Sequence, residues 1–191
     1  MFNNKEYNKI LDFIKKTNKN TKIIAISKNH PLESIKRALL FGIRIFGENR
    51  VFEAIDKFSI LKEKHKDIQL HLTGPLQTNK VSKALEIFDV FHTLDREKLA
   101  KEIKKNLNQK SNKKFFIQVN TGKEVNKSGV FPDIANEFID YCIKDLSLPV
   151  SGLMCIPPIS ENPSHHFKFL KSIAEKHNLN KLSMGMSADY E

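Results

Sequence analysis

The chain has 191 residues, of which 40% are hydrophobic. This length and apolar content suffice for a folded domain with a buried core and argue against a disordered chain. The formal net charge of +10 raises the question of a nucleic-acid partner, but the basic residues are almost all lysines scattered among glutamates. Because bidentate recognition of phosphates and base edges relies on arginine, we expect a solvated basic surface and no nucleic-acid partner.

The two cysteines, Cys142 and Cys155, lie apart in the sequence and form no metal-binding motif. Isolated thiols are typical of a reducing compartment. No apolar run approaches the ~18 residues of a membrane-spanning helix, and the first residues contain no apolar signal core. We therefore expect a cytoplasmic protein with no membrane partner, and we expect it to be a monomer.

An amphipathic helix is predicted at about residues 4–16, and after it short apolar runs alternate with helical patterns. The predicted strands are 22–27, 43–47, 68–73, 88–93, 114–120, 149–156 and 181–186. The predicted helices between them are 31–41, 50–64, 77–87, 96–107, 132–145 and 163–177. Asp95 and Asn162 precede two of these helices, and we expect their side chains to cap them.

Strands that alternate with helices, without linker tracts, predict one parallel α/β domain over residues 1–191. A doubly wound sheet and a (β/α)8 barrel both fit this alternation. No G-x-G-x-x-G follows the first strand, and polar residues follow nearly every strand; both features favour the barrel. The chain ends soon after the seventh strand, so we expect a barrel that lacks its eighth strand.

Polar side chains gather where the predicted strands end. Lys28 directly follows the first strand, and in a parallel barrel the carboxyl ends of the strands form the face on which sites are built. Lys28 is therefore a candidate reactive amine. His71 and His92 lie inside apolar strands, where we expect hydrogen-bonded core histidines, with acid–base catalysis as the alternative.

Ser187 follows the last predicted strand, 181–186, and we expect it to lie at the carboxyl end of that strand together with several backbone N–H groups. Barrels often hold phosphate near the ends of strands seven and eight. A reactive lysine together with a phosphate cradle indicates an aldehyde cofactor that carries a phosphate. Pyridoxal 5′-phosphate is the candidate, because a lysine amine captures its aldehyde as a Schiff base.

Seven short segments occur in an order that resembles the pyridoxal phosphate homeostasis protein family. They are AISK at 25–28, FGENRV at 46–51, HLTGPLQTNK at 71–80, QVN at 118–120, KSG at 127–129, GLMCIP at 152–157 and LSMGMS at 182–187. The fold of this family is similar to the amino-terminal barrel of bacterial alanine racemase. The resemblance extends from about residue 20 to the end of the chain.

The resemblance implies a set of cofactor-binding residues on four strands. These are Lys28, Asn49, Ile156, Pro157, Met184, Gly185 and Ser187. In the family pattern the lysine forms the Schiff base, the asparagine amide lies near the cofactor, and the Ile-Pro pair walls the ring. The segment that ends in the serine forms part of the phosphate cradle. Family members continue to an eighth strand whose arginine and Gly-Thr pair complete phosphate binding, and this chain stops before that segment.

The resemblance implies a pyridoxal-phosphate-binding protein of cofactor homeostasis, which carries or buffers the cofactor without robust turnover. Racemization needs a second acid–base group, and none of Tyr7, Tyr141 and Tyr190 lies in a strand-end motif. A racemase-like enzyme that uses pyridoxal phosphate is the alternative. A third reading is a barrel that binds another phosphorylated metabolite, with Lys28 acting only as a cation.

Overall fold

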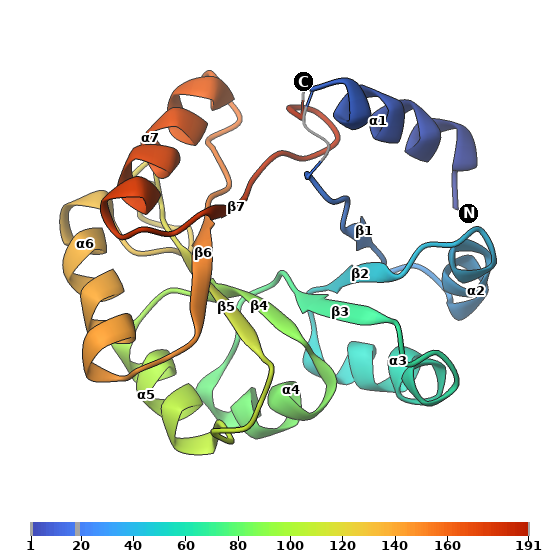
Figure 1. The fold of residues 1–191 in the computed structure, drawn as a ribbon, viewed down its shortest axis with the longest axis horizontal. Helices are drawn as coiled ribbons and strands as arrows, with labels where there is room; N and C mark the ends of the chain where they lie inside the picture. Colours follow the sequence, from blue (N-terminus) through green and yellow to red (C-terminus); the bar gives the residue numbers. More distant parts are fainter. Residues whose placement is uncertain (1, 18–19, 191) are drawn as a thin grey trace.

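The seven strands form one sheet in the order β1 to β7, and every neighbouring pair is parallel. The computed structural model describes residues 2–17 and 20–190. The strands are β1 (Ala25–Ile26), β2 (Ile45–Glu48), β3 (Gln69–Leu72), β4 (Val90–Leu94), β5 (Lys114–Gln118), β6 (Val150–Met154) and β7 (Lys181–Ser183). The sheet curves around a central space, with the helices on its outside (Figure 1).

One helix precedes the first strand, and the others connect successive strands, as the alternating pattern predicts. They are α1 (Asn4–Thr17), α2 (Leu32–Leu40), α3 (Val51–Lys64), α4 (Val81–Ile87), α5 (Glu97–Asn106), α6 (Pro132–Asp140) and α7 (Pro163–Lys176). A 3₁₀ turn, η1 (Thr78–Lys80), precedes α4, and a π-helical turn, η2 (Tyr141–Asp145), follows α6.

One of the two predicted helix caps is confirmed and the other is wrong. The Asn162 side chain accepts a hydrogen bond of 3.0 Å from the backbone N–H of Ser164 and caps α7. Asp95 does not cap α5, because its carboxylate pairs with the guanidinium of Arg96 at 2.5 Å, and α5 begins after Arg96 without a side-chain cap. The guanidinium of Arg96 thus binds the Asp95 carboxylate in place of the backbone N–H groups at the start of α5.

The sheet is buried on both faces. On β5 the side chains of Phe115 and Ile117 belong to the main core beneath the helices, whereas Phe116 between them points to the opposite face. There Phe116 packs with Val90 and Met154 in a separate buried cluster. Alternate strand positions therefore line the inside of the curved sheet, where polar groups of the site face one another.

The curved sheet is open between its first and last strands. Within the described residues β1 pairs only with β2, and β7 pairs only with β6. The segment after β7 lies beside α1, where the ring of Tyr190 meets the ring of Phe13 edge-on at 5.6 Å between centroids (Figure 1). This contact joins α1 and the segment after β7 at the open side of the barrel.

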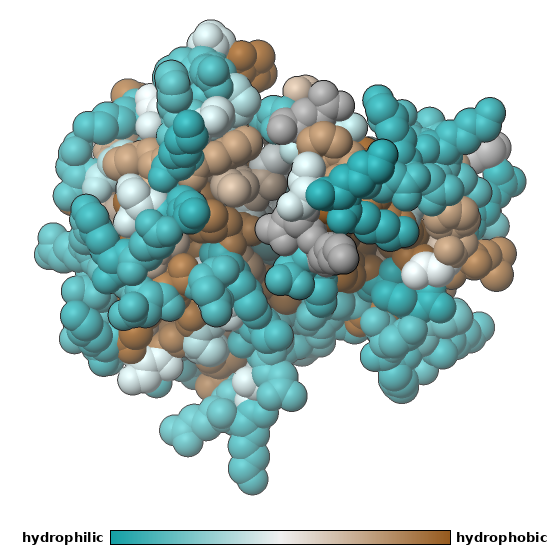
Figure 2. Space-filling view, turned by 45° about the horizontal axis from the view of Figure 1, so that its top comes forward, coloured by the Kyte–Doolittle hydropathy of each residue, from teal (hydrophilic) through white to brown (hydrophobic). Residues whose placement is uncertain are grey.

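The surface is largely hydrophilic on the face shown in Figure 2. Many lysines pair with a carboxylate one helical turn away, as Lys101 does with Glu97 and Lys144 with Asp140. Among the helices that the structure describes, none combines the length and the apolar character needed to span a membrane.

Gly152 is the position where the fold tolerates a side chain least. A methyl group there would collide with the backbone carbonyl of Lys181 on β7 and would lie 2.8 Å from the ring of Phe116. We expect Gly152→Ala to lower the free energy of unfolding by about 3 kcal/mol or more, since the backbone of β7 must move. Urea unfolding measures this change. The neighbouring Ser151→Ala should change it by less than about 0.5 kcal/mol, and equal effects would contradict this packing.

Candidate functional site

Lys28 and Asn49 lie at the same level of two paired strands. The register of the parallel pair places Ile26 beside Gly47, so Lys28 and Asn49 each follow two residues beyond a paired position. The backbone N–H of Ser27 donates to the carbonyl of Gly47 at 2.9 Å and extends this pairing toward Lys28. The two predicted site residues therefore emerge side by side at the carboxyl end of the sheet.

The strand that precedes Lys28 alternates its side chains between the inside and the outside of the barrel. A methyl group on Gly47 would lie 2.6 Å from the Cδ1 atom of Ile26 and 3.0 Å from the Cγ2 atom of Ile24, so these isoleucines occupy the inner face. Ser27 points the other way, where its hydroxyl donates to the Glu48 carboxylate at 2.7 Å. Lys28 is solvent-exposed and lies in the turn that follows β1, one position beyond Ser27.

Asn49 is held by the strand beside it. The hydroxyl of Thr73 donates to Asn49 Oδ1 at 2.9 Å, which leaves the amide nitrogen of Asn49 as the outward donor. A methyl group on Gly74 would lie 2.5 Å from the backbone oxygen and 2.7 Å from the Cβ atom of Asn49. Only glycine allows the β3 loop to approach Asn49 so closely.

The other half of the predicted site follows β6 and β7. Met154 pairs with Ser183, so Ile156 and Gly185 both lie two residues beyond this pair, at the carboxyl end of the sheet. The side chain of Ile156 is 49% exposed, whereas Pro157 is buried beneath it. Met184 is 42% exposed at the same end.

The segment from Met184 to Ser187 has the donors of an anion cradle. Gly185 has a φ of +84°, a conformation that favours glycine and turns successive N–H groups toward one side. Within the described residues the N–H groups of Gly185 and Ser187 donate to no protein acceptor, and the N–H of Met186 donates to the Asp189 carboxylate. An exposed amine, free N–H groups and a serine hydroxyl fit a ligand that carries an aldehyde and a phosphate.

A chain of polar side chains crosses the inside of the barrel below this face. His71 Nδ1 lies 2.8 Å from His92 Nε2, and His92 Nδ1 lies 2.8 Å from the Ser183 hydroxyl. The His92 ring also stacks on Phe116 at 4.7 Å between centroids. The expectation of hydrogen-bonded core histidines is confirmed. These hydrogen bonds connect β3 and β4 to β7, directly before the predicted cradle.

Both histidines are neutral at physiological pH. Burial lowers the pKa of His71 to about 4, with the nearby Lys114 and Lys22 acting in the same direction. Burial also lowers the pKa of His92 to about 3. Two neutral imidazoles can share one hydrogen bond, since one ring nitrogen donates and the other accepts. The hydrogen-bonded side chains of His71, His92 and Ser183 are therefore uncharged dipoles held in fixed positions.

A second polar group lies on the outer face, behind Lys28. Glu48 of β2 is fully buried, and its carboxylate contacts Ser27 and the ammonium of Lys57 on α3. Burial raises the pKa of Glu48, while the hydrogen bond from Ser27 and the charge of Lys57 oppose this rise. Glu48 lies in the segment FGENRV at 46–51, but no pattern in the sequence indicates that its carboxylate pairs with Lys57.

The structure thus brings the predicted residues to one end of the sheet in two groups. Lys28 and Asn49 follow β1 and β2, whereas the other five predicted residues follow β6 and β7. The polar chain of His71, His92 and Ser183 and the buried pair of Glu48 and Lys57 are additions that sequence patterns do not reveal. Strand register and helix packing bring these residues together.

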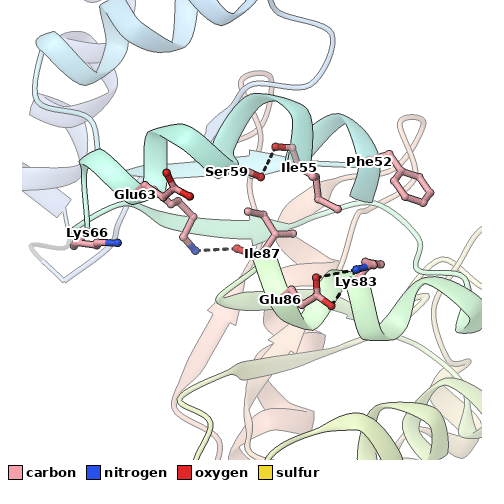
Figure 3. A pocket seen from close by; sticks show the side chains of 9 residues that line it. Phe52, Ile55, Ser59, Glu63, Lys66, Lys83, Glu86 and Ile87 are labelled. Atoms are coloured by element: carbon pink, nitrogen blue, oxygen red, sulfur yellow. Dashed lines mark hydrogen bonds and ion pairs between the residues drawn. The ribbon is translucent and has the colours of Figure 1, made fainter.

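A separate hollow of about 620 Å³ lies on the outer layer, between α3 and α4 (Figure 3). Phe52, Ile55 and Ile87 contribute its apolar lining. Two of its three lysines are already engaged, since Lys62 donates to the carbonyl of Ile87 and Lys83 pairs with a glutamate. None of the predicted site residues lines this hollow.

Comparison with known proteins identifies the family. The sequence model described as "Alanine racemase, N-terminal domain" matches residues 7–191. The pyridoxal phosphate homeostasis protein of Aquifex aeolicus is 38% identical over 181 residues, which cover 89% of this chain and 78% of the relative. The chain belongs to the pyridoxal phosphate homeostasis protein family.

Solved structures agree with this membership. PipY from Synechococcus elongatus, a structure with pyridoxal phosphate bound, superposes with a TM-score of 0.81 at 30% identity and covers 97% of this chain and 91% of its own. The alanine racemase of Clostridium difficile superposes with a TM-score of 0.70 at 13% identity, over 95% of this chain and 53% of the racemase. The latter likeness concerns the fold alone. The predicted barrel of the alanine racemase type is confirmed, and it is open in this structure.

The buried histidines predict an acid-dependent stability. Both pKa values in the folded state lie below the ordinary value of 6.5, so the unfolded chain takes up protons first as the pH falls. The contribution of the neutral histidines to the free energy of unfolding is fully present above pH 6.5. It is lost toward pH 3, at up to about 1.4 kcal/mol per pH unit for each histidine. Urea unfolding between pH 4 and 6.5 gives the slope of the free energy of unfolding against pH, and His92→Phe should reduce this slope by about half.

His30→Gln serves as the control, because His30 is exposed to solvent in the turn after β1. Its slope should equal that of the wild type. An unchanged slope in His92→Phe would show that the inner histidines do not titrate as their burial requires.

Proposed function

We propose that this chain binds pyridoxal 5′-phosphate through Lys28 and carries or buffers the cofactor in the cell, without robust turnover of its own. The observation that carries the proposal is the exposed amine of Lys28 beside Asn49, at the sheet end that also bears the donors of Gly185 and Ser187. The family name and the cofactor in the PipY structure support the same ligand.

The cofactor supplies an aldehyde that a lysine amine can capture, together with a phosphate that anchors the opposite end of its ring. Lys28 is the proposed amine, and Asn49 presents an amide nitrogen beside it. Gly185 and Ser187 offer backbone N–H groups and a hydroxyl to the phosphate. Ile156 and Met184 present apolar surface to the ring, and buried Pro157 supports the loop.

The arrangement of the tyrosines supports a carrier over a racemase. Racemization requires a second acid–base group on the side of the ring opposite the lysine. The ring of Tyr7 packs against Phe41, and Tyr141 lies under the ammonium of Lys101. Tyr190 lies beside the cradle, since a methyl group on Gly185 would be 3.6 Å from its Cα atom, but its ring meets Phe13 edge-on.

We propose further that the chain acts as one cofactor-binding unit, in the cytoplasm, as a monomer and without a nucleic-acid partner. The two free, buried cysteines support a reducing compartment. Burial raises the pKa of both thiols to about 12, so neither is a reactive thiolate at neutral pH.

Reduction with borohydride tests the covalent part of this proposal. Pyridoxal phosphate is added to the protein, the adduct is reduced, and the modified peptide is mapped. We expect one major adduct at Lys28 and its loss in Lys28→Arg, since a guanidinium cannot condense with the aldehyde. Lys36→Arg, an exposed lysine on α2, is the matched control and should retain the adduct. Modification spread over many lysines in the wild type would contradict the proposal.

The phosphate cradle is tested by comparing two ligands. We expect Ser187→Ala to weaken binding of pyridoxal phosphate by about tenfold, because one hydrogen bond to a charged group contributes about 1.5 kcal/mol. Binding of pyridoxal, which lacks the phosphate, should change by less than twofold. An absorbance titration with each ligand gives both values. Equal losses for the two ligands would place Ser187 outside the phosphate site.

A further inference from the structure

The turn that carries Lys28 is held on both sides by one helix. The ammonium of Lys57, on α3, donates to the backbone carbonyl of Ser27 at 3.0 Å. The carboxylate of Glu53, one turn earlier on α3, accepts from the backbone N–H of Asn29 at 2.8 Å. The residues directly before and after Lys28 are therefore both bonded to side chains of the same helix.

Lys57 is a cation whose hydrogen bonds are fully used. An ammonium has three N–H donors, and here they reach the Ser27 carbonyl, Glu48 Oε1 at 3.2 Å and Glu53 Oε1 at 2.6 Å. Its side chain is 14% exposed, and that of Glu48 is completely buried. The hydroxyl of Ser27 adds a fourth link, to the same oxygen of Glu48.

This group is poorly explained by stability alone. Removing charges from water costs several kcal/mol per ion, and well-packed apolar residues often stabilise a protein as much as a buried ion pair does. The same helix provides apolar contacts through Phe58 and Leu61, which are buried in the core. The charged group also fixes the backbone of the turn, because its hydrogen bonds reach the two residues that flank Lys28.

These bonds fix a turn with a left-handed residue. Asn29 has a φ of +60°, a conformation that asparagine adopts more readily than most residues other than glycine. The Glu53 carboxylate bonds the N–H of this residue, and the N–H of His30 closes the turn on the Ser27 carbonyl at 3.1 Å. The Ser27 carbonyl thus accepts from both His30 and Lys57, which fixes the peptide that precedes Lys28.

We propose that Glu48, Glu53 and Lys57 act together as a positioning group that fixes the turn of Lys28, so that its amine enters the barrel and reacts at one place. The inference rests on the proposed function of Lys28. Holding the reacting amine in a single geometry removes conformational freedom that would otherwise be lost on reaction. The three residues lie on the outer face and act through the backbone without touching the ligand.

Lys57→Met tests this role, and Lys62→Met is the matched control. Lys62 lies five residues further along α3, is 22% exposed and pairs with Asp89, so its replacement also removes an ion pair of the same helix. For each protein we measure the rate of adduct formation with pyridoxal phosphate, the share of reduced adduct on Lys28, and the melting temperature.

We expect Lys57→Met to slow adduct formation at Lys28 at least fivefold and to shift a larger share of adduct to surface lysines. Lys62→Met should match the wild type in both readouts, even where the two variants lose similar amounts of melting temperature. Wild-type rate and adduct distribution in folded Lys57→Met would overturn the inference, as would equal losses in both variants.

Glu53→Ala provides the second test, and it decides the matter if Lys57→Met does not fold. The Glu53 side chain is 22% exposed, and its removal frees the N–H of Asn29 without leaving a buried charge on Glu48 unpaired. We expect a two- to fivefold slower reaction, and a wild-type rate would overturn the inference. A wild type that forms no adduct at Lys28 would instead refute the proposed function, so the two failures are distinct.

Discussion

The parallel hydrogen bonding between β1 and β2 is the constraint on which the rest of the site depends. It sets Ile26 beside Gly47 and therefore brings Lys28 and Asn49 to one level. β1 lies at the open edge of the sheet, and only two of its residues pair there. The proposed direction of the amine then depends on how the turn after this short strand is held. The contacts from α3 supply this hold.

The two halves of the site are stabilised by different chemistry. On the side of Lys28 the support is ionic and lies between sheet and helix, where Lys57 meets two carboxylates. On the side of the cradle the support is a neutral chain inside the barrel, where His92 bonds the hydroxyl of Ser183. Both arrangements pair buried polar atoms that would otherwise destabilise the fold, although Glu48 Oε2 and His71 Nε2 are buried without a hydrogen-bond partner among the described residues. Each ends beside a segment that contributes to the proposed cofactor site.

The sequence predicts the order of elements well, because buried parallel strands are continuous apolar runs and the helices between them are amphipathic. It predicts strand lengths less well. The predicted run 22–27 has an apolar centre at residues 23–26, yet only Ala25–Ile26 is paired, at the open edge of the sheet. Asp95 shows the limit for caps, because the neighbouring Arg96 takes the carboxylate. A local sequence pattern shows neither how many residues of a strand pair with a neighbour nor which other group binds a potential cap.

The polar networks lie beyond what such patterns can reveal. The contact of His71 with His92 follows from a register in which His71 pairs with Val90, and no periodicity specifies that register. Glu53 and Lys57 form an ordinary pair one turn apart, which resembles many solvent-exposed pairs in this lysine-rich chain. Only the packing of α3 against β1 and β2 shows that this pair reaches the backbone of Ser27 and Asn29.

A crystal structure of the chain grown with pyridoxal phosphate is the decisive test of the proposed site. We expect continuous electron density from Lys28 Nζ into the cofactor, with the phosphate against the N–H groups of Gly185 and Ser187. A ring bound in the outer hollow between α3 and α4, or a phosphate on the opposite end of the sheet, would contradict it.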